Sequence, residues 1–182
     1  MKYVLFMLLA ALALPARAAD AYAVELVVFV RTGGETPPGG ELLPAVAQAR
    51  DPGPPSATPV PYARLTDADL ALTAQARRLI ASGRYRVLAH AGWWQPASAG
   101  AQGVRVDTLG SGLALGEALT GTVRLTETQV LRVIADLAVV REAGIGDGGV
   151  QRLHARRGVR PGEVHYLDHP TLGALVQVRP AP

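Results

Sequence analysis

From residue 84 onward, the chain is a series of short apolar or alternating runs with no helix-length pattern between them. Parallel strands need a crossover connection of a dozen or more residues, usually a helix, so this spacing argues against parallel βαβ units. The runs are instead expected to pair as antiparallel strands joined by turns. They lie at residues 84–95, 103–109, 119–140, 150–157 and 172–178, and the longest is expected to form a hairpin that turns near residues 127–129.

One more strand and one helix are expected before these runs. Residues 23–31 (AVELVVFVR) are apolar and β-branched, which predicts a buried strand. The helix should begin after Thr66, an N-cap residue with Asp69 in the capping-box position, and end at Gly83. Its expected buried face consists of Leu72, Ala76, Leu79 and Ile80. Together these patterns predict an α+β fold, a mostly antiparallel β-sheet with one main α-helix packed on it.

The amino terminus predicts a secretory signal peptide at residues 1–18. Its start is positively charged, residues 3–14 are apolar, and residues 16–18 (ARA) match a small-x-small cleavage site. The apolar run is shorter than the roughly 20 residues that a membrane-spanning helix needs. The mature chain, residues 19–182, is therefore expected to be one periplasmic domain without a membrane span, and residues 32–61, rich in Pro and Gly, are expected to form a surface loop.

Signal cleavage also changes the charge balance. It removes Lys2 and Arg17, which leaves 16 basic residues, all arginine, against 15 acidic ones, a net charge of about +1. A chain so close to neutral has no signature of nucleic-acid binding. The sequence contains no cysteine, which excludes disulfides, thiolate metal sites and cysteine nucleophiles. Export without disulfides favours a bacterial periplasm.

The motifs of common enzymes are missing. The sequence has no H-E-x-x-H, S-x-x-K, G-x-S-x-G or P-loop motif. The densest polar segment is HYLDHP, in which His165 and His169 are four residues apart. On a helix this spacing would suggest zinc, but Pro170 follows and the segment is expected to be extended. A structural turn, a ligand-binding surface that includes His165, and a metal site remain open; we expect no metal and no cofactor.

The segment HAGWWQP, residues 90–96, is a candidate sugar contact. Alternation places His90 and Trp94 on one face of the expected strand and Trp93 on the other, more apolar face. Trp93 is therefore expected in the core. An exposed Trp94 could stack on a sugar ring, with His90 beside it.

The segment QRLHARR, residues 151–157, is a candidate carboxylate contact. Arg152, His154 and Arg156 share one face of the expected strand and form a cationic stripe suited to the carboxylates of cell-wall stem peptides. A solvated sheet face is the alternative. We expect the stripe to lie near His90 and Trp94, so that the two form one binding surface.

These segments together resemble the CsiV family of periplasmic peptidoglycan-binding proteins. Members share an early strand E-x-x-V-F-x-R, a central Y-x-V-L-x-H-x-x-W-x-Q segment, and a C-terminal R-R-x-x-x-x-E-x-H-Y-L-D-H-P-x-x-G-x-L-V-Q-I/V motif. This chain matches the C-terminal motif at Arg156, Arg157, Glu163, His165, Tyr166, Leu167, Asp168, His169, Pro170, Gly173, Leu175, Val176 and Gln177. It matches the central one at Tyr85, Val87, Leu88, His90, Trp93 and Gln95. The resemblance implies a non-catalytic envelope protein that binds peptidoglycan and supports cell-wall integrity and cell shape.

The residues and the resemblance together predict a non-catalytic periplasmic peptidoglycan-binding protein. Its partner is expected to be peptidoglycan, with cell-wall synthesis proteins as a further partner class and no nucleic acid. The residues expected to bind the ligand are His90, Trp94, Arg152, Arg156 and His165. Two alternatives remain: an adaptor that regulates wall synthases, and a metal-dependent cell-wall hydrolase that uses His90, His165 and His169.

Overall fold

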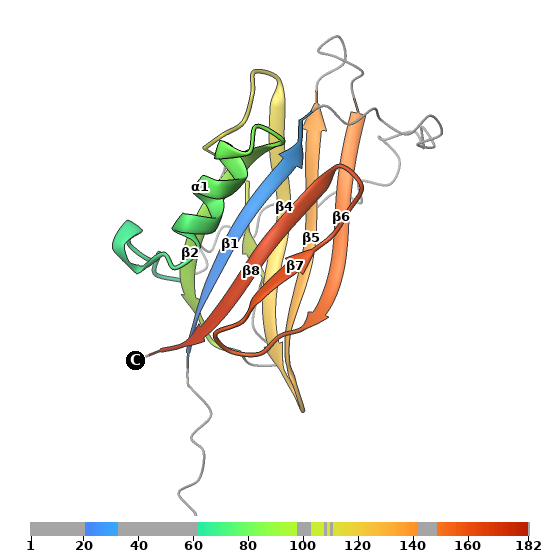
Figure 1. Cartoon of the computed structure of the whole chain (residues 1–182). Coiled ribbons are helices and arrows are strands. Elements are labelled where there is room, and N and C mark those ends of the chain that lie inside the picture. The colour runs from blue at the N-terminus through green and yellow to red at the C-terminus, as the bar shows by residue number, and fades with distance from the viewer. Residues whose placement is uncertain are drawn as a thin grey trace, which may run out of the picture.

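The computed structural model describes residues 21–32, 62–97, 103–107, 109, 111–141 and 149–181. Within these ranges the chain forms strands and one α-helix (Figure 1), namely β1 (Tyr22–Arg31), α1 (Thr73–Ala81), β2 (Tyr85–Gln95), β3 (Val104–Arg105), β4 (Glu117–Glu127), β5 (Leu131–Arg141), β6 (Gly149–Gly158), β7 (Val164–Leu167) and β8 (Leu172–Pro180). The strand expected at 103–109 is reduced to β3. In this part of the chain no helix is long and apolar enough to cross a membrane. The predicted signal peptide and nearly all of the predicted 32–61 loop lie outside the described residues.

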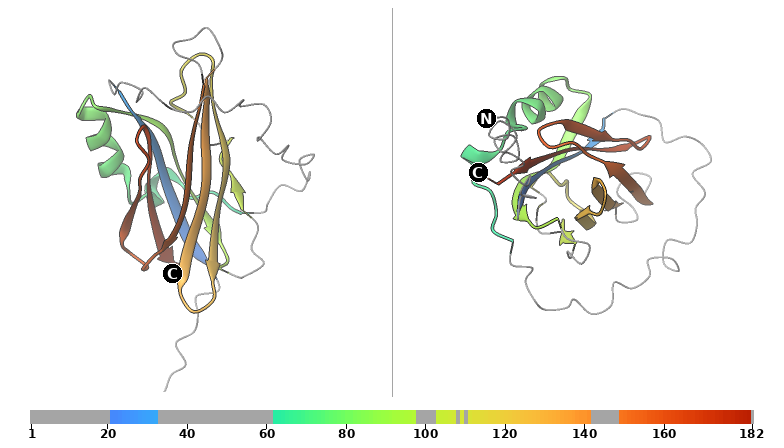
Figure 2. Two further views of the ribbon diagram at one scale, coloured as in Figure 1. Left: turned by 90° about the vertical axis from the view of Figure 1, so that its right-hand side faces the viewer. Right: turned by 90° about the horizontal axis from the view of Figure 1, so that it is seen from below.

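The strands form two sheets rather than one. The first has the order β2-β1-β8-β7 and the second the order β3-β4-β5-β6, with each neighbouring pair antiparallel. Figure 2 shows the sheets packed face to face, with α1 on the outer side of the first. The predicted α+β class and antiparallel pairing are confirmed. The number of sheets was not predictable because alternation identifies the core-facing residues but not how many sheets share that core.

The main core lies between the two sheets. On β5, the odd-numbered residues from Leu131 to Val139 are at most 7% exposed, while their even-numbered neighbours are half-buried. Trp93 reaches the same core from β2 and is 2% exposed, as predicted. Its indole Nε1 donates to Gln95 Oε1 at 3.0 Å, so the polar atom of this large side chain is satisfied inside the core. Burial of these apolar groups is the main favourable term for the fold.

A buried carboxylate links the sheets at one end. The side chain of Glu117 on β4 is 5% exposed and accepts hydrogen bonds from Arg86 on β2 at 2.8 Å and from Arg141 on β5 at 2.9 Å. Burial acts to raise the pKa of Glu117, but the Ala114 backbone N–H and the two guanidinium groups outweigh it and hold the pKa below its ordinary value. The side chain is therefore a paired carboxylate that joins both layers.

The helix is shorter than predicted. Thr66 and Asp69 form the predicted capping box, but it caps a single 3-10 turn, and the backbone is extended at the next residue. α1 begins only at Thr73. Leu72 is fully buried as predicted, whereas Ile80 is 59% exposed because the helix turns it away from the sheet. The predicted face was therefore wrong at its last residue.

The HYLDHP segment forms β7 and then a corner that leads into β8. At the corner, His169 Nδ1 accepts the backbone N–H groups of Thr171 at 3.4 Å and Leu172 at 3.3 Å. Burial lowers the pKa of His169, which favours the neutral ring that can accept these bonds. This half of the segment is the structural turn that the sequence allowed.

Candidate functional site

The predicted site residues lie on three separate surfaces. His90 and Trp94 are on the outer, α1-bearing face of the first sheet, while Arg152 and Arg156 are on the outer face of the second sheet. His165, on β7, faces the second sheet. The expectation that the arginines lie near His90 and Trp94 is wrong, because the core of the sandwich separates them. Alternation correctly placed His90 and Trp94 on one face of their strand, and Arg152 and Arg156 on one face of theirs. The two strands, however, belong to different sheets.

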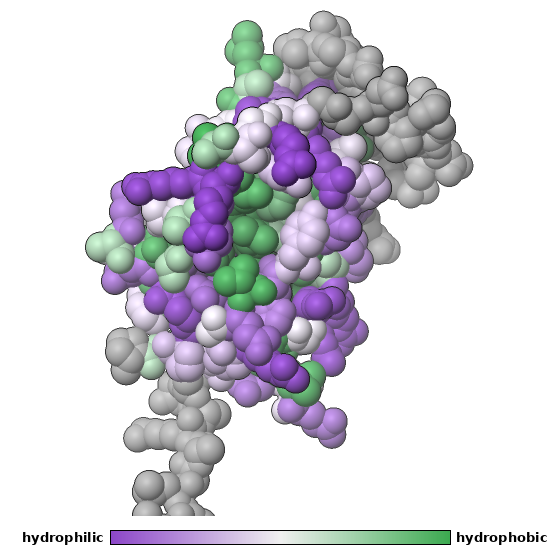
Figure 3. All heavy atoms as spheres, viewed as in Figure 1, coloured by the Kyte–Doolittle hydropathy of each residue, from purple (hydrophilic) through white to green (hydrophobic). Residues whose placement is uncertain are grey.

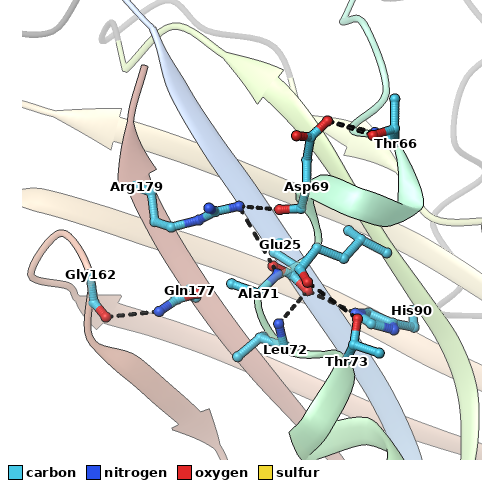
Figure 4. Close-up of polar contacts among 11 residues, drawn as sticks. Glu25, Thr66, Asp69, Ala71, Leu72, Thr73, His90, Gly162, Gln177 and Arg179 are labelled. Atoms are coloured by element: carbon cyan, nitrogen blue, oxygen red, sulfur yellow. Dashed lines mark hydrogen bonds and ion pairs between the residues drawn. The ribbon is translucent and has the colours of Figure 1, made fainter. Parts of the chain in front are cut away.

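His90 belongs to a buried cluster around Glu25 (Figure 4). Glu25 is fully buried, and its Oε1 lies 2.8 Å from His90 Nε2 and accepts the Leu72 N–H at 2.8 Å. Its Oε2 accepts the Ala71 N–H at 2.7 Å. Burial acts to raise the pKa of Glu25, but the bonds from His90, Leu72 and Ala71 outweigh it and lower the pKa. A carboxylate on β1 thus satisfies free backbone donors where α1 begins, which is the role of a helix cap.

Arg179 and Asp69 close the rim of this cluster. Arg179 Nη2, on β8, lies 4.0 Å from Glu25 Oε2 and donates to the Asp69 backbone oxygen at 2.6 Å. The Asp69 carboxylate in turn accepts the Thr66 hydroxyl at 2.6 Å. The cluster therefore connects β1, β2 and β8 with the segment that leads into α1. His90 is held inside this structural network, and its role as a ligand contact stays a prediction.

Trp94 lies at the edge of the same face and is half-buried. Its backbone N–H donates to the Ala63 oxygen at 2.9 Å, so the segment before the helix runs along the edge of β2. Leu65 packs over Gly92, where an added Cβ would lie 2.5 Å from the leucine Cδ1. The indole is therefore partly covered and partly open, and contact between Trp94 and a ligand also stays a prediction.

His165 lies at a hollow where β6 ends and β7 begins. Its Nε2 accepts the Arg160 backbone N–H at 3.1 Å, so this ring nitrogen carries no proton in that bond. The hollow has a volume of about 390 Å³, and Leu131, Arg157 and Glu163 also line it. His165 therefore combines a structural bond with a position beside two arginines.

The outer face of the second sheet carries a concentration of charged side chains. Alternation along β4, β5 and β6 points a group of polar side chains away from the core, namely Thr120, Thr122, Arg124, Thr126, Arg132, Asp136, Arg152, His154 and Arg156, with Ile134 among them. We call this surface the cationic face. It has four arginines and one histidine against one aspartate. Figure 2 shows α1 on the far side of the molecule, and none of the described helices or strands packs across this face.

Only one arginine of the cationic face is neutralised there. Arg152 binds Asp136 with two parallel hydrogen bonds, Nε to Oδ1 at 2.9 Å and Nη2 to Oδ2 at 2.7 Å. The hydrogen bond from Arg152 lowers the pKa of Asp136, so this pair is charged at neutral pH. In contrast, Arg124, Arg132 and Arg156 make no ion pair with any described residue. None of these three guanidinium groups is therefore neutralised by a carboxylate of the described ranges.

Two of these three arginines lie in one row across the sheet. Ile134 pairs with Arg124 on one side and with Arg156 on the other. Two strand spacings separate the arginines, a distance of roughly 10 Å between their backbones. Guanidinium groups bind carboxylates with two parallel hydrogen bonds, and the neighbouring Thr122 and Thr126 hydroxyls can donate to or accept from sugar hydroxyls. The row suits a ligand with spaced carboxylates and adjacent hydroxyl groups.

Three important residues were not identified from the sequence. Glu25 is a single carboxylate inside an apolar strand, and that pattern alone signals a buried, paired charge. Arg124 and Arg132 share the outer face of the predicted hairpin, so alternation would have placed them beside the 151–157 stripe if the pairing of these strands had been known.

The histidines of the alternative metal site do not come together. His90 is bound to Glu25 on the α1 side of β2, His165 faces the second sheet from β7, and His169 lies in the β7–β8 corner. Over the ranges that the structure describes, no group of three His, Asp or Glu side chains is placed to hold a metal ion.

Comparison with known proteins gives one match. A family model described as "Peptidoglycan-binding protein, CsiV" matches residues 2–181. A search of the curated proteins and a search of the solved structures found no match. The family match spans nearly the whole chain, including both sheets and α1.

Proposed function

We propose that this chain, which belongs to the CsiV family of peptidoglycan-binding proteins, is a non-catalytic periplasmic protein that binds the cell wall through its cationic face. One observation carries the choice of surface. Arg124, Arg132 and Arg156 lie on a side of the sandwich that no described element covers, and they have no ion-pair partner in the described part of the chain. The family supports peptidoglycan as the ligand, and the position of the site is our inference.

The chemistry of the cationic face matches that of peptidoglycan. Stem peptides offer carboxylates for the arginines, and glycan strands offer hydroxyl groups for the threonines. The expected mature chain is close to neutral overall, so the excess of positive charge on this face is local rather than a general property of the protein. A surface of one charge sign raises the concentration of an oppositely charged ligand beside it.

The proposal also covers location and effect. The predicted signal peptide, residues 1–18, which lies outside the described ranges, would direct export, and its removal would release the mature chain into the periplasm, where the wall is accessible. A protein that holds peptidoglycan without cutting it would support wall integrity and cell shape. The missing enzyme motifs support this non-catalytic role.

Charge reversal on the cationic face is expected to weaken wall binding by at least about tenfold, which corresponds to about 1.4 kcal/mol. The double variant Arg124→Glu, Arg156→Glu places two carboxylates where the proposed ligand has its own, so attraction becomes repulsion. The measurement is co-sedimentation of purified mature protein with insoluble wall sacculi over a range of protein concentrations. Wild-type binding should also weaken as salt rises, because exposed ion pairs are screened.

The matched control is the double variant Arg77→Glu, Arg84→Glu. It changes the net charge by the same amount, and both arginines are exposed, Arg77 on α1 and Arg84 between α1 and β2. The control should bind sacculi nearly as well as the wild type, and both variants should keep the wild-type unfolding temperature. Equal losses of binding in the two variants would show that only overall charge matters and would refute the proposed site.

A further inference from the structure

A groove runs between α1 and the β8 side of the first sheet. Its lining includes Leu79 from the helix, Tyr85 from β2 and Leu175 from β8, with Gln75 and Arg78 along the helix side. Its volume is about 230 Å³, enough for one large side chain. Figure 3 shows an apolar patch in the centre of this face, between α1 and strands β8 and β7, with hydrophilic groups around it.

The apolar surface continues from the groove onto β7. Tyr166 lies opposite Leu175 in the strand register and is 41% exposed, and Val164 on the same strand face is 42% exposed. The Tyr166 ring stacks on Phe29 at a centroid distance of 6.1 Å, and Phe29 meets Tyr85 edge-on at 5.3 Å. The rings of Phe29, Tyr85 and Tyr166 are thus already packed against one another. Binding of a ligand would therefore lose little conformational entropy from these side chains.

The charges beside the groove are mainly positive. α1 contains Arg77 and Arg78 but no acidic residue, and Arg78 lines the groove. On the other side, Arg31 is 47% exposed at its side chain and lies 3.7 Å from Asp168. Gln75 lines the groove, and its buried Oε1 accepts no hydrogen bond from any described residue. A ligand that fits must therefore combine negative charge with an apolar group.

We propose that this groove binds an acidic segment of a partner protein, with one large apolar side chain against Leu79, Tyr85 and Leu175 and a carboxylate on Arg78. This surface lies on the opposite side of the sandwich from the cationic face, so the protein can hold the wall and a partner at the same time. Twofold pairing with a second copy would bring like basic groups together, which opposes association. A lipid bilayer offers a broad surface, whereas the groove accepts a single side chain.

The test uses a display library of random 12-residue peptides selected on the immobilised mature protein. Enriched peptides should contain Asp or Glu close to Leu, Phe or Trp. Each enriched peptide is then synthesised with a fluorescent label, and its Kd is measured by anisotropy. Arg78→Glu is expected to weaken binding by about tenfold or more. Arg77→Glu is the matched control: it reverses the neighbouring arginine, which is not among the groove residues, and should change the Kd by less than about twofold.

Several results would overturn the proposal. These are the absence of enrichment, enrichment of neutral or basic peptides, and equal weakening by the two arginine variants. A concentration-dependent dimer that the enriched peptides dissociate would assign the groove to a second copy. Binding to phosphatidylglycerol vesicles that the same variant abolishes would assign it to a lipid surface. Arg78→Glu should leave sacculus binding unchanged, so this outcome is independent of the proposed wall-binding function.

Discussion

Replacement of Glu25 by alanine is expected to lower the free energy of unfolding by about 3–5 kcal/mol. The carboxylate is fully buried and holds the N–H groups of Ala71 and Leu72 and the ring of His90. Without it, these donors stay buried and lose their acceptor, which costs the full desolvation of each group. A typical domain has only about 5–15 kcal/mol of stability in total. Urea unfolding followed by circular dichroism measures the loss.

Glu25→Gln is the matched control. The glutamine amide keeps one acceptor oxygen but turns an N–H₂ group toward one of the donors. The free energy of unfolding should therefore fall less in Glu25→Gln than in Glu25→Ala. The pKa of Glu25 is lowered in the folded state, so its contribution is present above the unfolded pKa and disappears as the pH falls through the folded pKa. The difference in the free energy of unfolding between the wild type and Glu25→Gln should therefore be largest at neutral pH and should decrease as the pH falls through the folded-state pKa of Glu25. A loss below about 1 kcal/mol for Glu25→Ala at neutral pH would contradict the capping role.

Replacement of Trp93 by alanine should destabilise the protein by about 3–5 kcal/mol. Trp93 is 2% exposed in the core between the sheets, and its indole donates to Gln95, which is also fully buried. The change removes a large apolar surface from the core, leaves a cavity that the neighbouring strands cannot close, and breaks this hydrogen bond. Thermal and urea unfolding give the magnitude.

Trp94→Ala is the natural comparison because it deletes the same side chain one residue away. Trp94 is half-buried on the opposite face of β2, so less than half of the Trp93 effect is expected. A larger loss for Trp94→Ala than for Trp93→Ala would mean that the orientation of β2 is reversed, and equal losses would contradict the burial of Trp93 alone in the core. The comparison therefore tests the strand register without any assumption about ligands.

Much of the fold follows from local patterns in the sequence. Period-two alternation placed Trp93 in the core and located the β4–β5 hairpin, since one face of each strand must be apolar. The first residue of α1 could not be predicted from local sequence patterns. The capping box of Thr66 and Asp69 forms as predicted but caps the preceding 3-10 turn, while Glu25 accepts the Ala71 N–H across 46 residues of sequence and α1 begins only after that contact. A cap from a distant strand leaves no local pattern in the helix sequence.

The candidate site was harder to predict because it depends on which strands become neighbours. The outward orientation of Arg152 and Arg156 was predicted from their own strand, and the structure confirms it. Their neighbours Arg124 and Arg132 come from the hairpin, and His90 and Trp94 belong to the other sheet. Alternation orders residues within a strand, whereas the site is a property of the assembled sheet.

Binding of peptidoglycan to the cationic face is tested most directly by backbone amide NMR of the mature protein, titrated with soluble muropeptides that carry free stem-peptide carboxylates. The largest shift changes should occur at Thr122, Arg124, Ile134 and Arg156, and they should disappear in the Arg124→Glu, Arg156→Glu variant. Shift changes clustered around Trp94 and the start of α1, with the amides of the cationic face unchanged, would contradict the claim.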